Sequence, residues 1–576
     1  MPGRPVPPRP QQRPPYRPPE DQATVVMPPL PGEPEPAPQP ASQSLAKASG
    51  SMMIANLVSR VTGFVRQIML VGVLGIGTIN DSYTVSNNLP NIVYELLLGG
   101  VLASVVIPVL VRAQHEDADG GEGYTQRLLT VATVVLAVGT VIAIAASPLL
   151  TKLYFSPGGQ DKPELTTFLS YLILPEIFFY GVFGLLSGIL NARQVFRPAA
   201  WAPVANNLVM FVTLGLFAIL PGEITLNPLK MGEPKLLLLG LGTTAGIVLQ
   251  AVLLVPALRR TGFRFRWRWG WDRRMSTFGR LSLWLVVYTL ISQVSQVVLT
   301  KVATGAEAGS ITIYSNSWLL LQVPYGVLGV SLLTAIMPRL SKAAAVGDVE
   351  GVVANLSRGT RMSTTMLIPI VGLMTVLGPQ IGIALFAIRH GSTNSAAELG
   401  LALTTSAFGI VFYGITMLQM RVFYAMNKAS TPTTINAIMV GVKVILFYTA
   451  AHAIDPHHLV YALTFINGLG FIISMLLGQY FLRRRVGALH FGPVVRTIVK
   501  VTVATVWGAG AALLVAKGLD LVLTGTSAGA TDLRAWVTLI LGTLVGLPLT
   551  FGVMVLLRVN EIQPAVSRLR RLAHRG

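Results

Sequence analysis

The stretch that decides the fold is MMIANLVSRVTGFVRQIMLVGVLGIGTI, Met52 to Ile79, an apolar segment with two arginines inside it. Thirteen residues separate Arg66 from Ile79, and at about 1.5 Å per residue they reach roughly 20 Å of a hydrocarbon core about 30 Å thick. A membrane helix that ends near Asn80 therefore starts near Arg60, which places Arg66 inside the core and Arg60 at its inner edge. Charges at this depth are costly and occur mainly beside a partner, a cavity or a substrate path.

The two arginines share one helical stripe with other polar residues, because Asn56, Ser59, Arg60 and Arg66 recur at helical spacing. The alternative is a pair that snorkels at a helix end, with the guanidinium groups among the headgroups. A stripe of cations inside a membrane favours an anionic substrate, and guanidinium groups hold phosphate oxygens in pairs. We expect these four residues to bind a diphosphate.

The composition indicates a protein that crosses the membrane many times. Of 576 residues, 52% are hydrophobic and only 12% are charged, and the mean hydropathy is +0.62. The net charge of +20 is spread over short loops, which argues against a nucleic-acid partner. The absence of cysteine excludes disulfides and thiolate metal sites.

Hydropathy predicts an all-α protein with about fourteen transmembrane helices. The expected spans are 50–77, 83–111, 128–151, 166–190, 200–220, 235–258, 278–300, 310–337, 362–388, 399–420, 432–451, 459–482, 497–516 and 535–557. If the N-terminus is cytoplasmic, the inner loops hold 22 Lys and Arg and the outer loops hold 8. The positive-inside rule therefore predicts that both termini are cytoplasmic.

The expected organisation has six parts. They are a disordered Pro-rich cytoplasmic tail (1–45), an N-lobe of six helices (46–258), a basic cytoplasmic loop (259–277), a C-lobe of six helices (278–485), two further helices (486–558) and a cytoplasmic tail (559–576). Arginine alternates with tryptophan in the basic loop, as in some nucleic-acid sites, but flanking spans favour contact with anionic headgroups.

The second and eighth spans end alike. The block from Gly99 to Ala113 and the block from Gly329 to Ala343 each place glycine nine residues before a proline, followed by Pro-x-Leu-x-basic-Ala. An offset of six spans means that both copies run in the same direction, which predicts two parallel lobes around a central path. The alternative is chance similarity between apolar helices.

Few other ionisable residues lie inside the spans: Asp81, Glu95, Glu176 and Lys443. Asp81 and Glu95 can balance the arginines when the site is empty, which makes them candidates for gating. The alternative is a permanent Arg–Asp pair that holds two helices together. The sequence contains no phosphate loop of the ATPase type and no nucleophile elbow, so we expect no enzymatic activity, cofactor or metal.

Several motifs resemble the MurJ/MviN lipid II flippases. They are Ser59-Arg60-x-x-Gly63-Phe64-x-Arg66, Asp81, Leu89-Pro90-Asn91, Pro108, the exit Gly188-Ile189-Leu190-Asn191-Ala192-Arg193, and Pro324-Tyr325-Gly326-Val327-Leu328-Gly329. The resemblance implies the MOP exporter fold, a bacterial cytoplasmic membrane, and export of undecaprenyl-diphosphate-linked peptidoglycan precursor by alternating access. It also implies that Arg60, Arg66 and Asp81 correspond to the family's cavity arginines and aspartate, and that the last two helices form a lipid-tail groove. Asn91 is a further candidate for substrate binding.

The chain departs from that family at three points. Tyr94 and Glu95 stand where many relatives have arginines, and a further family arginine falls near Leu319. The sodium site proposed in some relatives needs acids in the seventh and eleventh spans, whereas this chain has Lys443 in the eleventh. A fixed ammonium there is a candidate substitute for the cation.

Two other functions remain open at this point. One is a different MOP-type exporter, for another polyprenyl-linked glycan or for drugs, although a cationic stripe disfavours the usual cationic drugs. The other is a scaffold for envelope assembly that does not transport and recruits cell-wall synthesis proteins through the Pro-rich tail. Beyond lipid II, membrane lipids are the expected partners.

Overall fold

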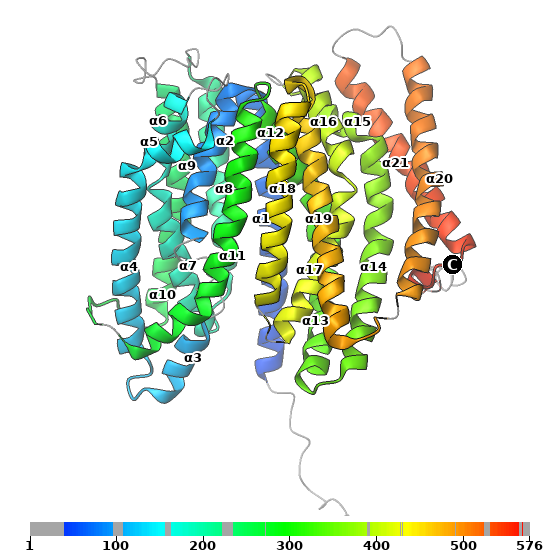
Figure 1. Ribbon diagram of the computed structural model, residues 1–576. Helices are drawn as coiled ribbons and strands as arrows, with labels where there is room; N and C mark the ends of the chain where they lie inside the picture. Colours follow the sequence, from blue (N-terminus) through cyan, green and yellow to red (C-terminus); the bar gives the residue numbers. More distant parts are fainter. Residues whose placement is uncertain are drawn as a thin grey trace, which may run out of the picture. The chain divides into compact units, whose positions relative to one another are not determined.

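The computed structural model describes residues 40–95, 107–155, 163–221, 234–270, 272–388, 392–426, 428, 430–489, 491–522, 530–563 and 567. The chain divides into two units, Met1–Gly50 and Ser51–Gly576. The predicted tail lies largely outside the described residues, and α1 begins within its predicted range, at Pro40. The second unit is built from helices, and its described residues contain no strand (Figure 1).

The helices up to the basic loop form the first half, residues 51–260. They are α1 (Pro40–Leu74), α2 (Thr78–Tyr94), α3 (Ile107–Glu116), α4 (Glu122–Ala145), α5 (Ser147–Tyr154), α6 (Pro163–Ile173), α7 (Glu176–Ala192), α8 (Arg197–Ile219), α9 (Pro234–Val252) and α10 (Leu254–Arg260).

The helices after the loop form the second half, residues 273–486, and a C-terminal pair. They are α11 (Arg273–Thr304), α12 (Ser310–Pro324), the π-helix η4 (Tyr325–Gly329), α13 (Val330–Ala345), α14 (Val349–Val376), α15 (Gly378–Phe386), α16 (Thr393–Ser406), α17 (Gly409–Ala425), α18 (Ser430–Ala453) and α19 (Pro456–Val486), followed by α20 (Gly492–Val522), α21 (Ala530–Leu556) and the short 3₁₀ helix η5 (Asn560–Ile562).

Ten described helical segments are long and apolar enough to cross a membrane, or twelve if two bent pairs each count as one span. The bent pairs are α14 with α15, at 77°, and α16 with α17, at 50°. The predicted total of fourteen is not confirmed. The two remaining positions are the second and eighth, where α2 and α3 flank residues 96–106, outside the described part, and where η4 interrupts α12 and α13.

The internal repeat extends to the ends of the helices. Asp119 accepts a hydrogen bond from the backbone N–H of Gly123, and Asp348 accepts one from Gly351 at the equivalent turn. The C-terminal ends of α7 and α17 have the same backbone hydrogen bond. Val195 N–H donates to Leu190 O after α7, and Lys428 N–H donates to Phe423 O after α17. These shared turns support two copies of one unit with the same direction, as predicted.

The same clamp holds the first helix of each half. Asn207 of α8 donates from Nδ2 to Ser59 O (3.1 Å) and Thr62 Oγ1 (2.8 Å) of α1. Asn436 of α18 donates from Nδ2 to Tyr288 O (3.2 Å) and Ser292 Oγ (2.9 Å) of α11. An asparagine that satisfies a carbonyl and a hydroxyl on a neighbouring helix is a common link between membrane helices.

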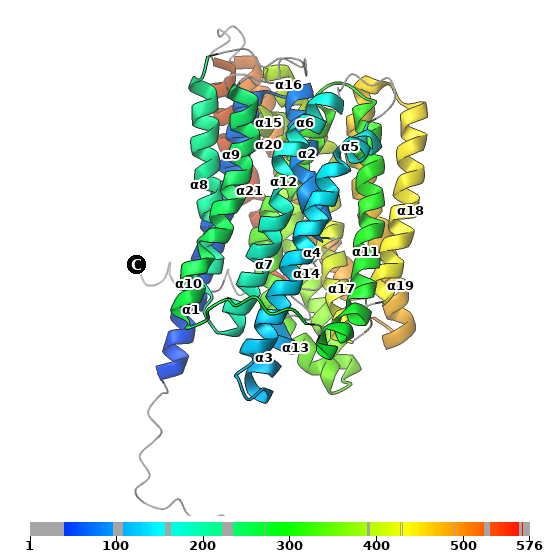
Figure 2. The ribbon, with the colours of Figure 1, turned by 90° about the vertical axis from the view of Figure 1, so that its left-hand side faces the viewer.

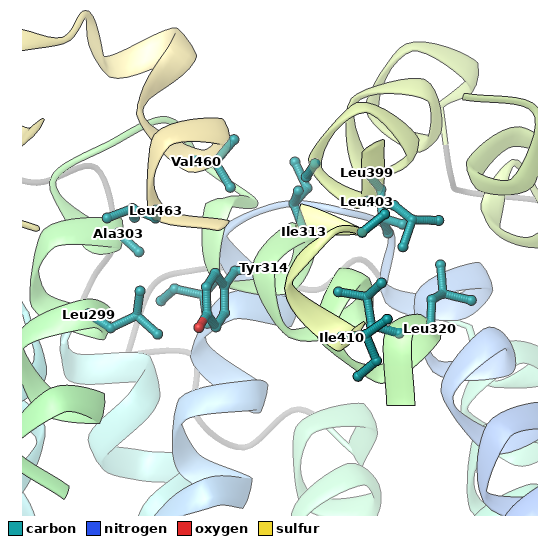
Figure 3. Packing of buried hydrophobic residues seen from close by; sticks show 14 of the residues in the cluster. Leu299, Ala303, Ile313, Tyr314, Leu320, Leu399, Leu403, Ile410, Val460 and Leu463 are labelled. Atoms are coloured by element: carbon teal, nitrogen blue, oxygen red, sulfur yellow. The ribbon is translucent and has the colours of Figure 1, made fainter. Parts of the chain in front are cut away.

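The hydrophobic clusters join the halves at one end only. We call the end where α2 and α12 begin the upper end, as in Figure 1. The largest cluster contains side chains of both halves, among them Val85 and Ile177 from the first and Ile313 and Leu463 from the second. In Figure 3, Tyr314 of α12 lies between side chains of α11 and those around Leu403.

Toward the opposite, lower end each half has its own cluster. One comprises buried side chains between Leu110 and Phe263, and the other comprises buried side chains between Ile336 and Leu489. Among the described residues, neither cluster contains a side chain of the other half. Figure 2 gives a second view of the first-half helices. The packing therefore fastens the halves together at the upper end and not at the lower end.

Two further segments complete the fold. The residues before α11 are extended and attached to the first half, since Arg268 N–H donates to Thr130 Oγ1 and Phe263 is buried beneath the Arg193 guanidinium. Trp267 and Trp269 are 60% and 68% exposed, as a headgroup contact requires. The C-terminal pair α20 and α21 packs on α14 and α15, and Arg361 of α14 forms an ion pair with Glu561 at 2.8 Å.

Candidate functional site

A polar cavity of about 660 Å³ lies between the two halves. Its walls come from α2, α11, α12 and α19, and they are lined by Asn88, Asn91, Ile92, Glu95, Gln293, Gln296, Tyr314, Ser315, Trp318, Leu319, Gln322, Asn467 and Phe471. A cavity of this size is typical of sites for organic ligands. Carboxamide groups dominate the wall, and Glu95 is the ionisable acid among its described residues.

Asp81, about two helical turns before the cavity residue Asn88 on α2, joins the two halves. Its carboxylate is buried and accepts hydrogen bonds from Gly309 N–H (2.7 Å), Thr312 N–H (2.8 Å) and Thr312 Oγ1 (2.6 Å). These donors form the N-terminus of α12, where free N–H groups and the helix dipole favour an anion. Asp81 of α2 thus caps a helix of the other half. The N-cap residue of α12 itself is Gly309, which has no side chain to supply this bond.

Arg60 lies lower, against the π-helix of the second half. A Cβ atom added at Gly326 would overlap Arg60 Nη1, so the glycine makes room for the guanidinium. The side chain of Arg60 is exposed, and Gly326 follows the cavity residue Gln322 by about one helical turn. Arg60 therefore lies beside the lower edge of the cavity. The depth inferred from the sequence assumed a helix end near Asn80, whereas α1 ends at Leu74, so both arginines lie inside the candidate span Ser51–Leu74.

Arg66 is half-buried and faces the first half. Its charge acts on Tyr83 of α2 and on Glu176 and Tyr180 of α7. Among the described residues, neither Asp81 nor Glu95 forms an ion pair with Arg60 or Arg66. The acid near Arg66 is Glu176, for which the sequence suggested no role.

Other predicted site residues divide into two groups. Asn91 and Glu95 line the cavity, and Gln293 Nε2 donates to Glu95 Oε2 at 3.4 Å. Asn56 is exposed and Ser59 is half-buried on α1, and neither belongs to the cavity wall. Glu95 and Leu319, two of the positions that the sequence analysis named as departures from the family pattern, both line the cavity.

Lys443 lies inside the second half and does not snorkel. Its ammonium is buried and donates to Asn467 Oδ1 at 2.7 Å, with the Phe447 ring 5.6 Å away. Asn467 belongs to the cavity wall, so a single carboxamide separates the ammonium from the cavity. Gly470 leaves room for the aliphatic stem, because a Cβ there would lie 2.6 Å from Lys443 Cδ.

Three of these contacts were not predicted from the sequence. Thr312 as the partner of Asp81 depends on packing between helices far apart in the chain. The asparagines of α8 and α18 are inconspicuous, although their equivalent positions in the repeat are a usable signal. Gly326 has a sequence signal, since it lies in the block that resembles the flippases.

Comparison of the fold with solved structures defines the class of protein. The fold matches a lipid II flippase MurJ in an inward closed conformation, with a TM-score of 0.67 and 17% identity over 88% of this chain and 98% of that one. It also matches an inward-facing multidrug resistance transporter of the MATE family, with a TM-score of 0.61 and 15% identity over 76% and 99% of the two chains. The protein thus has the fold of the MOP superfamily of membrane transporters, as predicted.

The family model for lipid II flippase MurJ matches residues 70–525. This chain therefore belongs to the lipid II flippase MurJ family. It is 24% identical over 415 residues to a probable lipid II flippase MurJ of Rhizobium meliloti, over 70% of this chain and 75% of the relative. It is 26% identical over 400 residues to the lipid II flippase MurJ of Burkholderia cenocepacia, over 68% and 74%.

The resemblance stated from the motifs is confirmed by this match. The fold alone would not have separated a flippase from a drug exporter, because both share it. The matched range begins after Arg66, so the role of the two arginines depends on their own geometry and not on family membership.

Proposed function

We propose that this chain moves lipid II, the undecaprenyl-diphosphate-linked peptidoglycan precursor, from the inner to the outer leaflet of a bacterial cytoplasmic membrane. Membership of the flippase family carries the proposal. The site adds chemical support, because the Arg60 guanidinium lies against Gly326, about one turn beyond the cavity residue Gln322, and a second guanidinium, Arg66, lies on the same helix. Such groups suit a diphosphate, which stays charged throughout the passage.

In this proposal Arg60 and Arg66 bind the diphosphate. Arg60, beside the lower edge of the cavity, meets the substrate first, and Arg66 holds it deeper in the membrane. Asn91 supplies hydrogen bonds from the cavity wall, and Asn56 and Ser59 supply them from α1. Glu95 offsets positive charge near the cavity.

Alternating access follows from the uneven attachment of the halves. A shared hydrophobic cluster and the Asp81 cap fasten the upper end, whereas each half has a separate cluster below. Release of Asp81 from Thr312 would free α2 from α12 and open the upper end. We assign Asp81 the role of a gate, and Lys443 the role of a fixed cation beside the cavity.

The proposed topology places the lower end, with Arg193 and Arg259 at its helix exits, in the cytoplasm. In Figure 1, α1 rises from the lower end and α21 runs downward from the upper end, directions that support cytoplasmic ends for both helices. The Pro-rich tail then lies in the cytoplasm, where it is available to cell-wall synthesis proteins.

Complementation of a flippase-depleted bacterium tests the proposal. Wild-type protein should restore growth and the exposure of labelled lipid II on the outer leaflet. Arg66→Ala should restore neither at an equal amount in the membrane, while Arg259→Ala, which removes an exposed cytoplasmic arginine, should behave as wild type. Failure of the wild type would overturn the function, and full growth with Arg66→Ala would overturn the site. Deleting residues 1–43 should leave transport largely intact, whereas a scaffold would fail.

A further inference from the structure

The wall of the central cavity combines side-chain amides with aromatic rings. Carboxamides from four helices line it: Asn88 and Asn91 of α2, Gln293 and Gln296 of α11, Gln322 of α12 and Asn467 of α19. Each of these groups both donates and accepts hydrogen bonds. The described residues of the wall include no arginine or lysine. The wall itself therefore suits an uncharged ligand whose hydroxyl and amide groups also both donate and accept.

Trp318 supplies a flat apolar surface in this polar wall. Its ring stacks on that of Phe471, with the centroids 5.5 Å apart and the planes 20° from parallel, and both residues line the cavity. The Tyr413 ring packs edge-on against both, at 5.5 Å from Trp318 and 5.0 Å from Phe471. These contacts hold the Trp318 ring in one orientation, while its side chain remains only half-buried.

Two amides of the wall have a defined hydrogen-bonding direction. Lys443 Nζ donates to Asn467 Oδ1 at 2.7 Å, and an ammonium is only a donor, so Asn467 Nδ2 remains as a donor for a ligand. Gln293 Nε2 donates to Glu95 Oε2, and Gln293 Oε1 is buried with no hydrogen-bond partner among the described residues. The wall thus offers a ligand a donor on α19 and an acceptor on α11.

Arg60 lies against the π-helix that continues α12, and Trp318 lies higher, on α12 itself. Trp318 precedes Gly326, the residue that Arg60 contacts, by eight residues, or about 12 Å at the rise of an α-helix. A diphosphate held by Arg60 would place the group attached to it at the level of Trp318. In the lipid-linked precursor that group is a glycan, whose sugar rings carry C–H groups on their faces and hydroxyl groups around their rims. An aromatic ring flanked by amides complements both.

We propose that the cavity around Trp318 is a glycan-binding site, and that Trp318 determines specificity for the glycan of the transported lipid. The proposal rests on the proposed function, since the glycan is that of the precursor. The arginines of α1 bind the diphosphate, and the cavity binds the sugar. Removal of the Trp318 ring therefore weakens binding of a lipid diphosphate that carries the glycan and leaves binding of the bare lipid diphosphate unchanged.

A comparison of two ligands tests this division. Purified full-length protein in detergent is titrated with lipid II and, separately, with undecaprenyl diphosphate, which lacks the glycan. The wild type should bind lipid II more tightly. Trp318→Leu should weaken lipid II binding by about tenfold, without changing the affinity for undecaprenyl diphosphate. Trp318→Phe, which keeps a flat ring, should recover most of the loss.

Two further variants guard against trivial explanations. Trp201→Leu removes a tryptophan of α8 that is 42% exposed and outside the cavity wall, and it should bind both ligands as the wild type does. Gln296→Met removes an exposed carboxamide of the wall and should weaken only lipid II binding, by about threefold. This variant keeps the test decisive if Trp318→Leu does not fold.

The outcomes separate the glycan site from the function. Absence of binding of either ligand by the wild type, together with failed complementation, would overturn the proposed function. Equal affinity of the wild type for the two ligands would overturn the glycan site while the function stands. The same holds if Trp318→Leu or Gln296→Met weakens both ligands equally, or weakens neither.

Discussion

The carboxylate of Asp81, at the start of α2, accepts hydrogen bonds from both the backbone N–H and the hydroxyl of Thr312, 231 residues further along the chain at the start of α12. The first half of the protein thus supplies the cap of a helix in the second half. Because α2 and α12 both line the central cavity, this bond lies where the halves must separate if the upper end opens.

Asp81→Asn should open the upper end more often. The amide keeps the shape but loses the charge, and hydrogen bonds to charged groups are worth about 1.5–3 kcal/mol, so a shift of about tenfold in the opening equilibrium is expected. The chain has no cysteine, so Ser315→Cys places a single thiol in the cavity wall. Its labelling by an impermeant maleimide added outside the cell should rise in Asp81→Asn and stay low in Asp520→Asn, an exposed control. Equal labelling in the two variants would show that Asp81 does not act as a gate.

Gly326→Ala should displace Arg60, because the added methyl group would overlap Arg60 Nη1. Lipid II export should then fall, by less than in Arg60→Ala because the exposed end of the arginine can shift, and the double variant should lose no more than Arg60→Ala alone. Gly441→Ala in α18 is the matched control, because a Cβ there meets nothing within 4 Å. Additive losses in the double variant would mean that Gly326 acts independently of Arg60.

Asn207→Leu and Asn436→Leu should destabilise the protein by similar amounts. Each removes two hydrogen bonds between helices, and such bonds in membranes contribute about 0.6–2 kcal/mol. Thermal unfolding in detergent should show lower midpoints for both, with additive effects because the two clamps lie in different halves. Asn355→Leu breaks a bond within α14 alone and should have a smaller effect. A large effect of one clamp without the other would argue against equivalent roles in the repeat.

Features that depend on local periodicity were predicted from the sequence, and those that depend on contacts between distant helices were not. The membrane helix that carries Arg60 and Arg66 was predicted from its hydropathy, but its end was placed near Asn80, whereas α1 ends at Leu74 and both arginines lie inside the span Ser51–Leu74. The expected pairing of Asp81 with an arginine is not observed, because backbone N–H groups of α12 satisfy it instead. Glu176 was visible as an acid inside a span, but its complete burial at the break between α6 and α7 depends on packing against α2, α4 and α9.

Lys443→Met tests whether a buried ammonium serves transport or folding. Replacing a buried charge by an apolar side chain of similar length is often neutral or stabilising, by about 1–4 kcal/mol, because the desolvation cost disappears. The unfolding midpoint should therefore stay equal or rise. Export of lipid II should fall, because Asn467 in the cavity wall loses the cation that orients its carboxamide. Lys517→Met, at an exposed position near the end of α20, should change neither quantity. A lower midpoint with unchanged export would make Lys443 a structural residue, whereas a stable protein with reduced export would show that the Lys443 amine serves transport.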